Sequence, residues 1–550
     1  MSEARLQEPE AKEGIVLQKT ETTAGRGKRI TKVCVWAVVV GLLYLPYIIG
    51  IPENPPGYYV DESALSYNAY LVAETGAGER GEKFPLFFPV YTGPFTQYAN
   101  PTEIYLLAIP FKIFGPGITI ARLFAATWVF AACLLLGLLA RRISGSGWIG
   151  ALVGGFALVT PWLFEVSRLV LETFFYPMAA VLLLWAVYRA SLKEKWGIID
   201  ISAITFALVL LTYSYTIGRL LGPMLAGGLI LFATGRRRIF SIASVWAAFA
   251  LTLIPLAVYA LQHPELTDRF RAVSYFKPGV GFTQITTTFG VRFFEELNPI
   301  TMLIAGDINP RHHLPAGLGS FYIGVFVLSL IGAVLVILRH RKDRWCLYVL
   351  FGAVASIVPG AMTNDHFHTL RMIAYPIFLL VLTIPALRWL LGFERDPSAE
   401  AAANPARSPR SAAIRQAILT ALLTLTIVQA GHFFWLFHRY GADRGEYFDA
   451  GYKVVYDAAV AQPERPIYLV DGYWGPAYVH ALWYATLEGR DTNEFIHLPY
   501  RTSPPEGSLV ISSEQSCIEC DLLLEEGGYL LYRKEGTAGP PSMTLPKTSR

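Results

Sequence analysis

Charged residues are scarce in this sequence. They make up 16% of its 550 residues, whereas a soluble domain carries about 25%. The deficit lies in long runs without any charge, which excludes a soluble protein and indicates a polytopic membrane protein. The net charge of +4 is small for this length, so the composition gives no sign of nucleic-acid binding.

Cysteine is also rare, with five residues in the whole chain. Cys34, Cys133 and Cys346 lie in apolar runs, where we expect them to act as small hydrophobic residues. Cys517 and Cys520 form a single CxxC near the C-terminus. Without a second pair, or histidines at ligand spacing, this motif does not predict zinc. A local disulfide is favoured if this region is extracytoplasmic.

The N-terminal residues 1–29 are polar, mixed in charge and poor in large apolar groups, which predicts a disordered cytoplasmic tail. The charge-free run 33–51 follows, and Lys28, Arg29 and Lys32 precede it. The run is long enough to span a bilayer, and no small-residue cleavage site follows it. We therefore expect an uncleaved first transmembrane helix.

Ten more charge-free runs bring the predicted number of spans to eleven. These runs are 123–140, 143–164, 173–188, 201–218, 220–235, 239–262, 314–338, 345–363, 372–387 and 416–431. The run 104–114 is too short to span and is expected to form a surface helix. With eleven spans, the basic loops fall on the side of the N-terminus, which the positive-inside rule makes cytoplasmic. These loops are 141–142, 193–195, 236–238, 339–344 and 388–415.

The C-terminal residues 439–550 differ from the rest of the chain. Residues 467–471, 508–512 and 529–533 have the pattern of short strands, and 477–487 that of a helix. We expect a small α/β domain on the outer face. The predicted fold class is thus an α-helical polytopic membrane protein of about eleven transmembrane helices over residues 30–438, followed by this extracytoplasmic α/β domain.

Unusual polar residues gather in the loops on the predicted outer face. The first outer loop, 52–117, holds Asp61, Glu62, Arg80 and Lys83. The later loops hold Arg168 and Glu172, Arg219, the DINPRHHLP segment with Asp307, Arg311, His312 and His313, and the DHFHTLR segment with His366, His368 and Arg371. A carboxylate can deprotonate an acceptor group, and Arg, Lys or His can hold a departing phosphate. These clusters predict group transfer from a lipid phosphate, with Asp61 as the base.

Structural roles are the alternatives for the same residues. Asp61 could cap a helix, and Glu62 could be a first-turn residue favoured by the helix dipole. Arg168 and Glu172, four residues apart, could pair with each other. Arg219 could anchor a helix end at the interface. We expect no metal centre. A divalent cation bound by Asp307, His312 and His313 is the less favoured alternative, because neighbouring histidines seldom both reach one ion.

The order of features along the chain is the most specific signal. A charge-poor first helix is followed by an acidic pair in the first outer loop, a surface helix ending FKIFGPG, and the segment ARLFAATWVFAACLLLGLLARRISG. Over roughly residues 30–390 this order resembles the GT-C superfamily of glycosyltransferases. It is most similar to the branch of the protein O-mannosyltransferases and the lipid A aminoarabinose transferases. SRLVLE and DHFHTLR are similar to segments of bacterial members.

The resemblance implies inverting transfer of a sugar from a polyprenyl-phosphate donor to a lipid, glycan or protein acceptor, with Asp61 as base or acceptor-positioning group. It also implies that the protein resides in a bacterial plasma membrane, with the endoplasmic reticulum as the less favoured location. The first loop has Ala99-Asn-Pro-Thr102 where the family usually has an HPPL-type turn, which leaves the sugar open. A transporter or lipid flippase is the alternative function, although such proteins place polar groups near the bilayer midplane. A non-catalytic scaffold would not need the polar clusters to converge on one face.

Overall fold

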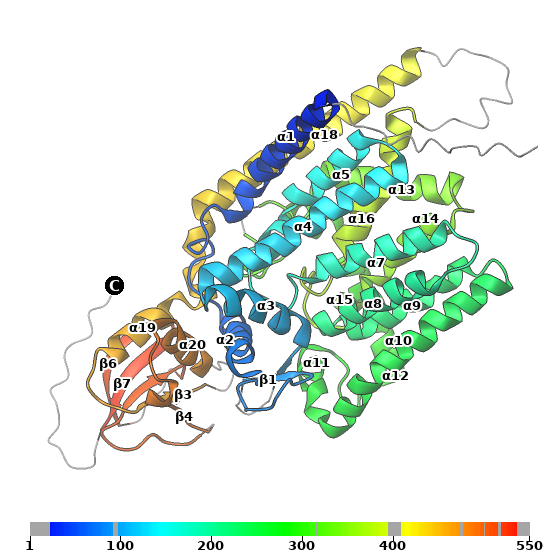
Figure 1. Ribbon diagram of the computed structural model, residues 1–550. Coiled ribbons are helices and arrows are strands. Elements are labelled where there is room, and N and C mark those ends of the chain that lie inside the picture. Colours follow the sequence, from blue (N-terminus) through cyan, green and yellow to red (C-terminus); the bar gives the residue numbers. More distant parts are fainter. Residues whose placement is uncertain are drawn as a thin grey trace, which may run out of the picture. The chain divides into compact units, whose positions relative to one another are not determined.

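The computed structural model describes residues 23–91, 97–314, 317–393, 409–472, 477–499, 501–514 and 519–535 (Figure 1). Two compact units are present. Met1–Ile49 contains the helix α1 (Thr23–Ile48), and Gly50–Arg550 contains all the other described elements. The helix α1 begins ten residues before the run predicted to span the membrane, inside the segment 1–29 that was expected to be a disordered tail. Residues 1–22 of that tail lie outside the described part of the chain.

Four helical stretches of the described chain are long and apolar enough to cross a membrane: Ile118–Ser144, Arg236–Gln262, Arg344–Ala361 and Ser411–Phe448. They correspond to α4 (Ile118–Ser144), α10 (Arg236–Gln262), α14 (Arg344–Ala355) with α15 (Val358–Ala361), and α18 (Pro409–Tyr440) with η4 (Gly441–Phe448). A further pair, α5 (Gly147–Val159) and α6 (Pro161–Ser167), is bent by 59°. The run 143–164 is thus broken at Pro161, because proline cannot donate the backbone hydrogen bond that a continuous helix needs.

Shorter apolar helices account for the other predicted runs. They are α8 (Ile198–Ser214), α9 (Gly218–Gly228) with η1 (Leu229–Phe232), α13 (Ile323–Arg339) and α16 (Tyr375–Leu390), and α7 (Tyr176–Ser191) occupies the run 173–188. The predicted runs therefore form helices, while the count of eleven spans stays a prediction.

Glycines bring these helices into close contact. A side chain at Gly137 of α4 would meet the carbonyl oxygen of Gly150 in α5 at 2.8 Å. At Gly332 of α13 it would meet the carbonyl of Leu382 in α16. Small residues at such crossings let two backbones approach closely, as in other membrane helix pairs.

The first outer loop folds into helices and a short hairpin. It comprises α2 (Val60–Thr75), the antiparallel pair β1 (Phe88–Val90) and β2 (Gln97–Ala99), and α3 (Pro101–Phe114). The expected surface helix 104–114 thus begins three residues earlier, with Pro101 in the first turn, where its missing N–H has no helical partner to lose. Between α10 and α13 lie η2 (Pro264–Thr267), α11 (Asp268–Val273), α12 (Phe282–Glu296) and the π-helical η3 (Thr301–Ala305).

The C-terminal region contains the expected sheet. It comprises α19 (Ala450–Val460), β3 (Ile467–Val470), α20 (Tyr478–Glu488), η5 (Thr492–Glu494), β4 (Phe495–His497), β5 (Leu509–Ser512), β6 (Cys520–Glu526) and β7 (Tyr529–Lys534). The strand order is β4-β3-β5-β7-β6, with β3 parallel to β4 and β5, and β7 antiparallel to β5 and β6. The predicted strands at 467–471, 508–512 and 529–533 are β3, β5 and β7, and the predicted helix 477–487 is α20. The boundary between residues 438 and 439 stays a prediction. Cys520 is disulfide-bonded, and Cys517 lies outside the described residues.

Helix α20 packs against α2 and so connects the C-terminal region to the first outer loop. The buried ring of Trp483 in α20 stacks on Tyr58 at 6.0 Å, centroid to centroid. The Trp483 ring also stacks on Phe111 of α3, at 5.8 Å between ring centroids. Aromatic stacking of this kind adds to the stabilisation from burial alone. The C-terminal region therefore supports the helix that carries Asp61.

Candidate active site

A cavity of about 700 Å³ lies among the loops that the sequence places on the outer face. Its polar lining comes from segments far apart in the chain: Tyr59 and Asp61 at the start of α2, Arg269 in α11, Asp307, Arg311 and His312 before α13, and His366, His368 and Arg371 before α16. Apolar residues, among them Leu220, Ile308 and Phe448, line the rest. The fold thus brings the Asp61 carboxylate of the first outer loop together with cationic side chains of three later loops.

Asp61 lies in the first turn of α2, with its side chain 25% exposed. Its Oδ1 accepts a hydrogen bond from the hydroxyl of Tyr91. Its Oδ2 lies 3.7 Å from Nη2 of Arg269. Burial, together with the negative charge of Asp61, raises the pKa of the Tyr91 hydroxyl well above its ordinary value, so Tyr91 stays protonated and can only donate to the carboxylate. Asp61 is therefore an accessible carboxylate held in place by a tyrosine and flanked by a cation.

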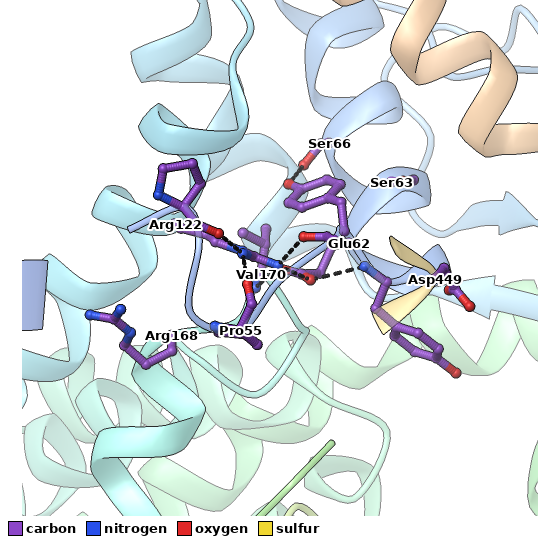
Figure 2. Close-up of polar contacts among 12 residues, drawn as sticks. Pro55, Glu62, Ser63, Ser66, Arg122, Arg168, Val170 and Asp449 are labelled. Atoms are coloured by element: carbon purple, nitrogen blue, oxygen red, sulfur yellow. Dashed lines mark hydrogen bonds and ion pairs between the residues drawn. The ribbon is translucent and has the colours of Figure 1, made fainter. Parts of the chain in front are cut away.

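Glu62, the next residue, is fully buried and does not line the cavity. Its two oxygens accept hydrogen bonds from Arg122, one from Nε at 3.0 Å and one from Nη2 at 2.8 Å, so the two side chains form a bidentate ion pair (Figure 2). The same carboxylate accepts the backbone N–H groups of Tyr59 and Val170. Such fork-to-fork pairs combine strong charge-assisted hydrogen bonds with a fixed geometry.

Arg122 of α4 also holds the chain that leads into α2. Its guanidinium donates to the backbone carbonyls of Pro52, Pro55 and Gly57, at 2.6–2.9 Å. The Glu62–Arg122 pair therefore ties α4, the segment 52–57, the start of α2 and the loop after α6 together. This arrangement favours a positioning role for Glu62 and leaves Asp61 as the carboxylate that faces the cavity.

Arg311 and Arg371 are arginines of the cavity that the sequence had singled out. Nη1 of Arg311 lies 2.6 Å from the Tyr59 hydroxyl, and its guanidinium lies 4.4 Å from the centre of that ring. Nη1 of Arg371 donates to Oγ1 of Thr363 at 2.6 Å and pairs with Asp365. With Arg269, they place three guanidinium groups around the cavity, the residue type best suited to bind phosphate.

The two outer loops that carry histidines are joined through Asp307. Oδ2 of this buried carboxylate accepts the backbone N–H and the hydroxyl of Thr369, both at 2.8 Å. It lies 3.1 Å from Nδ1 of His312. Burial opposes ionisation of Asp307, but the hydrogen bond and the charge of His312 outweigh it and hold the pKa of Asp307 below its usual range. Burial, reinforced by the nearby charges of His312 and Arg371, lowers the pKa of His368.

Asp307, His312 and His368 could hold a metal ion. One ligand atom from each residue lies within 4.8 Å of the others, and the buried Nδ1 of His368 has no hydrogen-bond partner. The sequence had paired Asp307 and His312 with His313 instead. A cation here would compete with Thr369 for Oδ2 of Asp307, so the geometry permits a metal without requiring one.

His313 is turned away from the cavity and held in the protein interior. Its Nδ1 lies 2.6 Å from Oε2 of Glu165, which also accepts the N–H of Leu314 through Oε1 at 2.7 Å. Burial alone would lower the pKa of His313, but the charge of Glu165 outweighs it and raises the pKa. Neighbouring histidines thus face different surroundings: His312 lines the cavity, and His313 joins the loop to α6.

Arg168 and Glu172 do not pair with each other. Arg168 is buried and donates through Nε and Nη2 to the carbonyl of Asn54, at 3.0 and 2.7 Å. Glu172 accepts the backbone N–H and, at 2.9 Å, the side-chain amide of Asn100. Burial raises the pKa of Glu172. Glu172 lines a small cavity of about 50 Å³ that also includes Asp61, Tyr91 and Arg269, whereas Arg168 lines neither cavity.

Three other predicted cations lie outside both cavities. Arg219 donates to Oδ1 of Asn100 at 3.0 Å and lies over the ring of Phe87. Arg80 and Lys83 are exposed in the segment between α2 and β1. Their predicted contact with substrate stays a prediction.

Arg269, Tyr59, Tyr91 and Phe448 line the cavities but were not among the predicted site residues. Tyr59 was visible, because it directly precedes Val60-Asp61 in the acidic segment. Arg269 lies in an outer segment of mixed charge whose pattern does not separate it from Arg271. Phe448 reaches the cavity from the end of η4, the short helix that follows α18, and this long-range contact has no local signal.

The C-terminal region makes polar contacts with the first turn of α2. Oδ2 of Asp449 accepts the N–H of Val60 at 2.9 Å, and its Oδ1 accepts the Tyr529 hydroxyl at 2.8 Å. Nδ1 of His480 lies 2.8 Å from Oγ of Ser63. These contacts fix the residues on either side of the Asp61-Glu62 pair, so the C-terminal region helps to orient Asp61.

Asp449→Asn should destabilise the protein at neutral pH by on the order of 2 kcal/mol, the usual value for hydrogen bonds to a charged group. Burial would raise the pKa of Asp449, but His480 and Tyr529 outweigh it and lower the pKa. A depressed pKa stabilises the fold above the unfolded value of about 3.9, and this stability is lost as pH falls through the folded value. At pH 6–7 the Tm of Asp449→Asn should therefore lie on the order of several degrees below that of wild type. This difference should shrink below about pH 4.

Asp457→Asn is the matched control for this measurement. Asp457 lies in the neighbouring helix α19 and forms an exposed pair with Lys453. Removing its charge should change stability by less than about 1 kcal/mol. An equal loss in both variants, or a loss that persists unchanged at low pH, would contradict the role given to Asp449.

Comparison with known proteins supports the family resemblance. Residues 99–261 match the family described as dolichyl-phosphate-mannose-protein mannosyltransferase, and no curated protein matches the sequence. The structure is similar to ArnT from Cupriavidus metallidurans in the apo state, with 15% identity and a TM-score of 0.53 over 94% of this chain and 100% of ArnT. ArnT bound to undecaprenyl phosphate matches with 13% identity and a TM-score of 0.53, over 92% of this chain and 99% of ArnT.

The archaeal oligosaccharyltransferase AglB from Archaeoglobus fulgidus, in complex with an inhibitory peptide and a dolichol-phosphate, has 15% identity and a TM-score of 0.49. That match covers 84% of this chain and 64% of AglB. The resemblance to the GT-C superfamily is confirmed by the family match and by the ArnT-like fold. The described chain thus combines an ArnT-like fold with four helical stretches that are long and apolar enough to cross a membrane.

Proposed function

We propose that this chain is an integral-membrane glycosyltransferase that transfers a sugar from a polyprenyl-phosphate donor to an acceptor on the extracytoplasmic face. The observation that carries the proposal is the placement of Asp61 in one cavity with Arg269, Arg311, Arg371 and His312. The cavity offers both a base for the acceptor and cations for the leaving phosphate. The fold of this chain is similar to that of ArnT, for which a structure with bound undecaprenyl phosphate exists, and this similarity supports a polyprenyl-phosphate donor.

In the proposed reaction, Asp61 accepts the proton of an acceptor hydroxyl or amine as that group attacks the anomeric carbon of the sugar. The bond from the acceptor to the anomeric carbon forms, and the bond from that carbon to the phosphate oxygen breaks. The electron pair of the broken bond leaves with the polyprenyl phosphate. Attack opposite the leaving group inverts the anomeric configuration.

The cations of the cavity stabilise the charge that develops on the leaving phosphate. Preorganised guanidinium groups bind that charge more strongly in the transition state than in the intact donor, which lowers the barrier. Tyr91 donates to Oδ1 of Asp61 and so holds the base in position. The apolar residues Leu220, Ile308 and Phe448 provide surface for the polyprenyl chain.

The remaining parts of the proposal follow from the sequence. The protein resides in the bacterial plasma membrane with its N-terminus in the cytoplasm and its C-terminal domain outside. The acceptor is a lipid, a glycan or a protein. Asp307, His312 and His368 are the residues that would hold a divalent cation if the reaction uses one.

Arg269→Gln tests the proposed role of the cations. Removing one preorganised donor to a developing charge lowers the rate by about 10²–10³-fold in other enzymes, so we expect a loss of that size in kcat/KM for sugar transfer. The measurement is release of label from a polyprenyl-phosphate sugar by purified protein in vesicles. Arg271→Gln is the control, since Arg271 lies on the same helix, is 67% exposed and pairs with Asp268 outside the cavity. Equal activity of Arg269→Gln and Arg271→Gln would contradict a role for Arg269.

A further inference from the structure

A second large cavity, of about 520 Å³, lies at the opposite ends of the helices from the candidate active site. It is lined at the C-terminal ends of α4, α7, α13 and α16 and at the N-terminal ends of α10 and α14. The candidate active site is lined by the loops at the other ends of α7, α10, α13 and α16. The 16 residues of α16 alone separate the two ends by about 24 Å.

Positive charge dominates the lining of this second cavity. Its cations are Arg238, Lys342, Arg344 and Arg388, and Asp343 is the one carboxylate among its described lining residues. The Asp343 carboxylate is already engaged, because its Oδ1 accepts the N–H groups of Trp345 and Cys346 and so caps α14.

The cations of this cavity are poorly compensated. In the described part of the chain Lys342, Arg344 and Arg388 form no ion pair, and Arg388 makes one long contact, 3.5 Å from Nη1 to the carbonyl of Ile143. Among the described residues, Arg238 donates to the backbone carbonyls of Lys193 and Glu194, and its guanidinium lies 5.6 Å from the centre of the Trp196 ring. A cavity with four such cations attracts an anion.

Apolar side chains make up much of the remaining lining, beside Tyr188, Ser191, Thr234 and His340. Val349, Leu382 and Ile384 are buried in its lining, and Leu192 in the same lining is 62% exposed. Close to it, Ile337 and Leu338 of α13 are also exposed. The cavity therefore joins a cationic lining to apolar surface, which suits a molecule with an anionic head and a hydrocarbon tail.

We propose that this cavity binds the phosphate headgroup of an anionic glycerophospholipid of the surrounding bilayer. Basic pockets between membrane helices on the cytoplasmic side bind such headgroups in other proteins, and the positive-inside rule places these basic loops on that side. A free phosphate ion has no hydrocarbon part that could contact the apolar side chains of the cavity. The polyprenyl-phosphate donor is needed at the other ends of the helices, where Asp61 lies. The inference does not depend on the proposed glycosyl transfer.

Lipid retention by the purified full-length protein tests this site. The protein is reconstituted in phosphatidylcholine vesicles with and without phosphatidylglycerol, and native mass spectrometry measures the bound lipid. Wild type should retain phosphatidylglycerol in preference to phosphatidylcholine. Each surface cation contributes about fivefold to the binding of an anionic lipid, so Lys342→Gln and Arg344→Gln should each weaken retention about fivefold. Arg388→Gln should weaken it by at least as much.

Arg341→Gln is the control, since Arg341 is exposed in the same turn but does not line the cavity. It should retain phosphatidylglycerol like wild type. Lys342 and Arg344 are themselves exposed, so their variants should fold, and equal Tm values in neutral detergent check this. The proposal is overturned if wild type retains both lipids equally, or if Arg341→Gln and Arg344→Gln lose the same amount of phosphatidylglycerol. It is also overturned if inorganic phosphate or polyprenyl phosphate displaces phosphatidylglycerol at a concentration below that of the lipid itself.

Discussion

Asp61→Asn is expected to lower kcat for sugar transfer about 10²–10⁴-fold, the usual contribution of a general base. Asparagine keeps the size of the side chain and can still accept the hydrogen bond from Tyr91, so the fold and the donor affinity should change little. The loss should therefore appear in kcat and not in KM. The measurement is initial-rate transfer in vesicles, with Tm recorded for each variant.

Asp268→Asn is the control for Asp61→Asn. Asp268 begins α11, pairs with Arg271 and does not line the cavity, so its variant should transfer sugar like wild type. If Asp61→Asn retained full activity while Glu62→Gln lost it at unchanged Tm, the base would be Glu62 and the assignment of the two carboxylates would be wrong.

Breaking the Glu62–Arg122 pair should have the second large effect, on stability. Both side chains are fully buried, and removing one partner leaves the other as an uncompensated buried charge, which costs about 3–5 kcal/mol. Arg122→Gln should be at the upper end of this range, because it also leaves the carbonyls of Pro52, Pro55 and Gly57 without their donor. Thermal unfolding of the purified variants checks the expected fall in Tm.

Lys112→Gln is the control for this pair. Lys112 and Glu74 form an exposed ion pair at 3.3 Å, and such pairs contribute about 0–1 kcal/mol. The contrast with Asp61 is the sharper test: Glu62→Gln should lower Tm, whereas Asp61→Asn should lower kcat at nearly constant Tm. A Glu62→Gln variant with the Tm of wild type would contradict the structural role of the pair.

The helices were predictable because a membrane helix needs a long charge-free run, and that composition is visible without any alignment. The break at Pro161 was hidden because it lies inside such a run. In the C-terminal region, β3, β5 and β7 have the apolar pattern of buried strands. The strand β6 reads CDLLLEE, and its side chains are mostly exposed, so its pattern did not separate it from a loop.

The site was predictable only as a set of outer loops. Adjacent residues of a helix point about 100° apart, so Asp61 and Glu62 necessarily face different surroundings, but the sequence does not say which one faces the cavity. The same limit applies to His312 and His313. The roles of Glu62 and His313 depend on Arg122 and Glu165, which are distant in sequence and become neighbours only in the fold.

The most direct test of the proposed function is the transfer assay itself. Purified wild type and Asp61→Asn are placed in vesicles with a panel of radiolabelled polyprenyl-phosphate sugars and lipid, glycan and peptide acceptors. We predict that wild type moves the label from one donor to an acceptor with release of polyprenyl phosphate, and that Asp61→Asn does not. Movement of the intact labelled lipid across the bilayer by both proteins, without cleavage of any donor, would contradict the proposal and indicate a flippase.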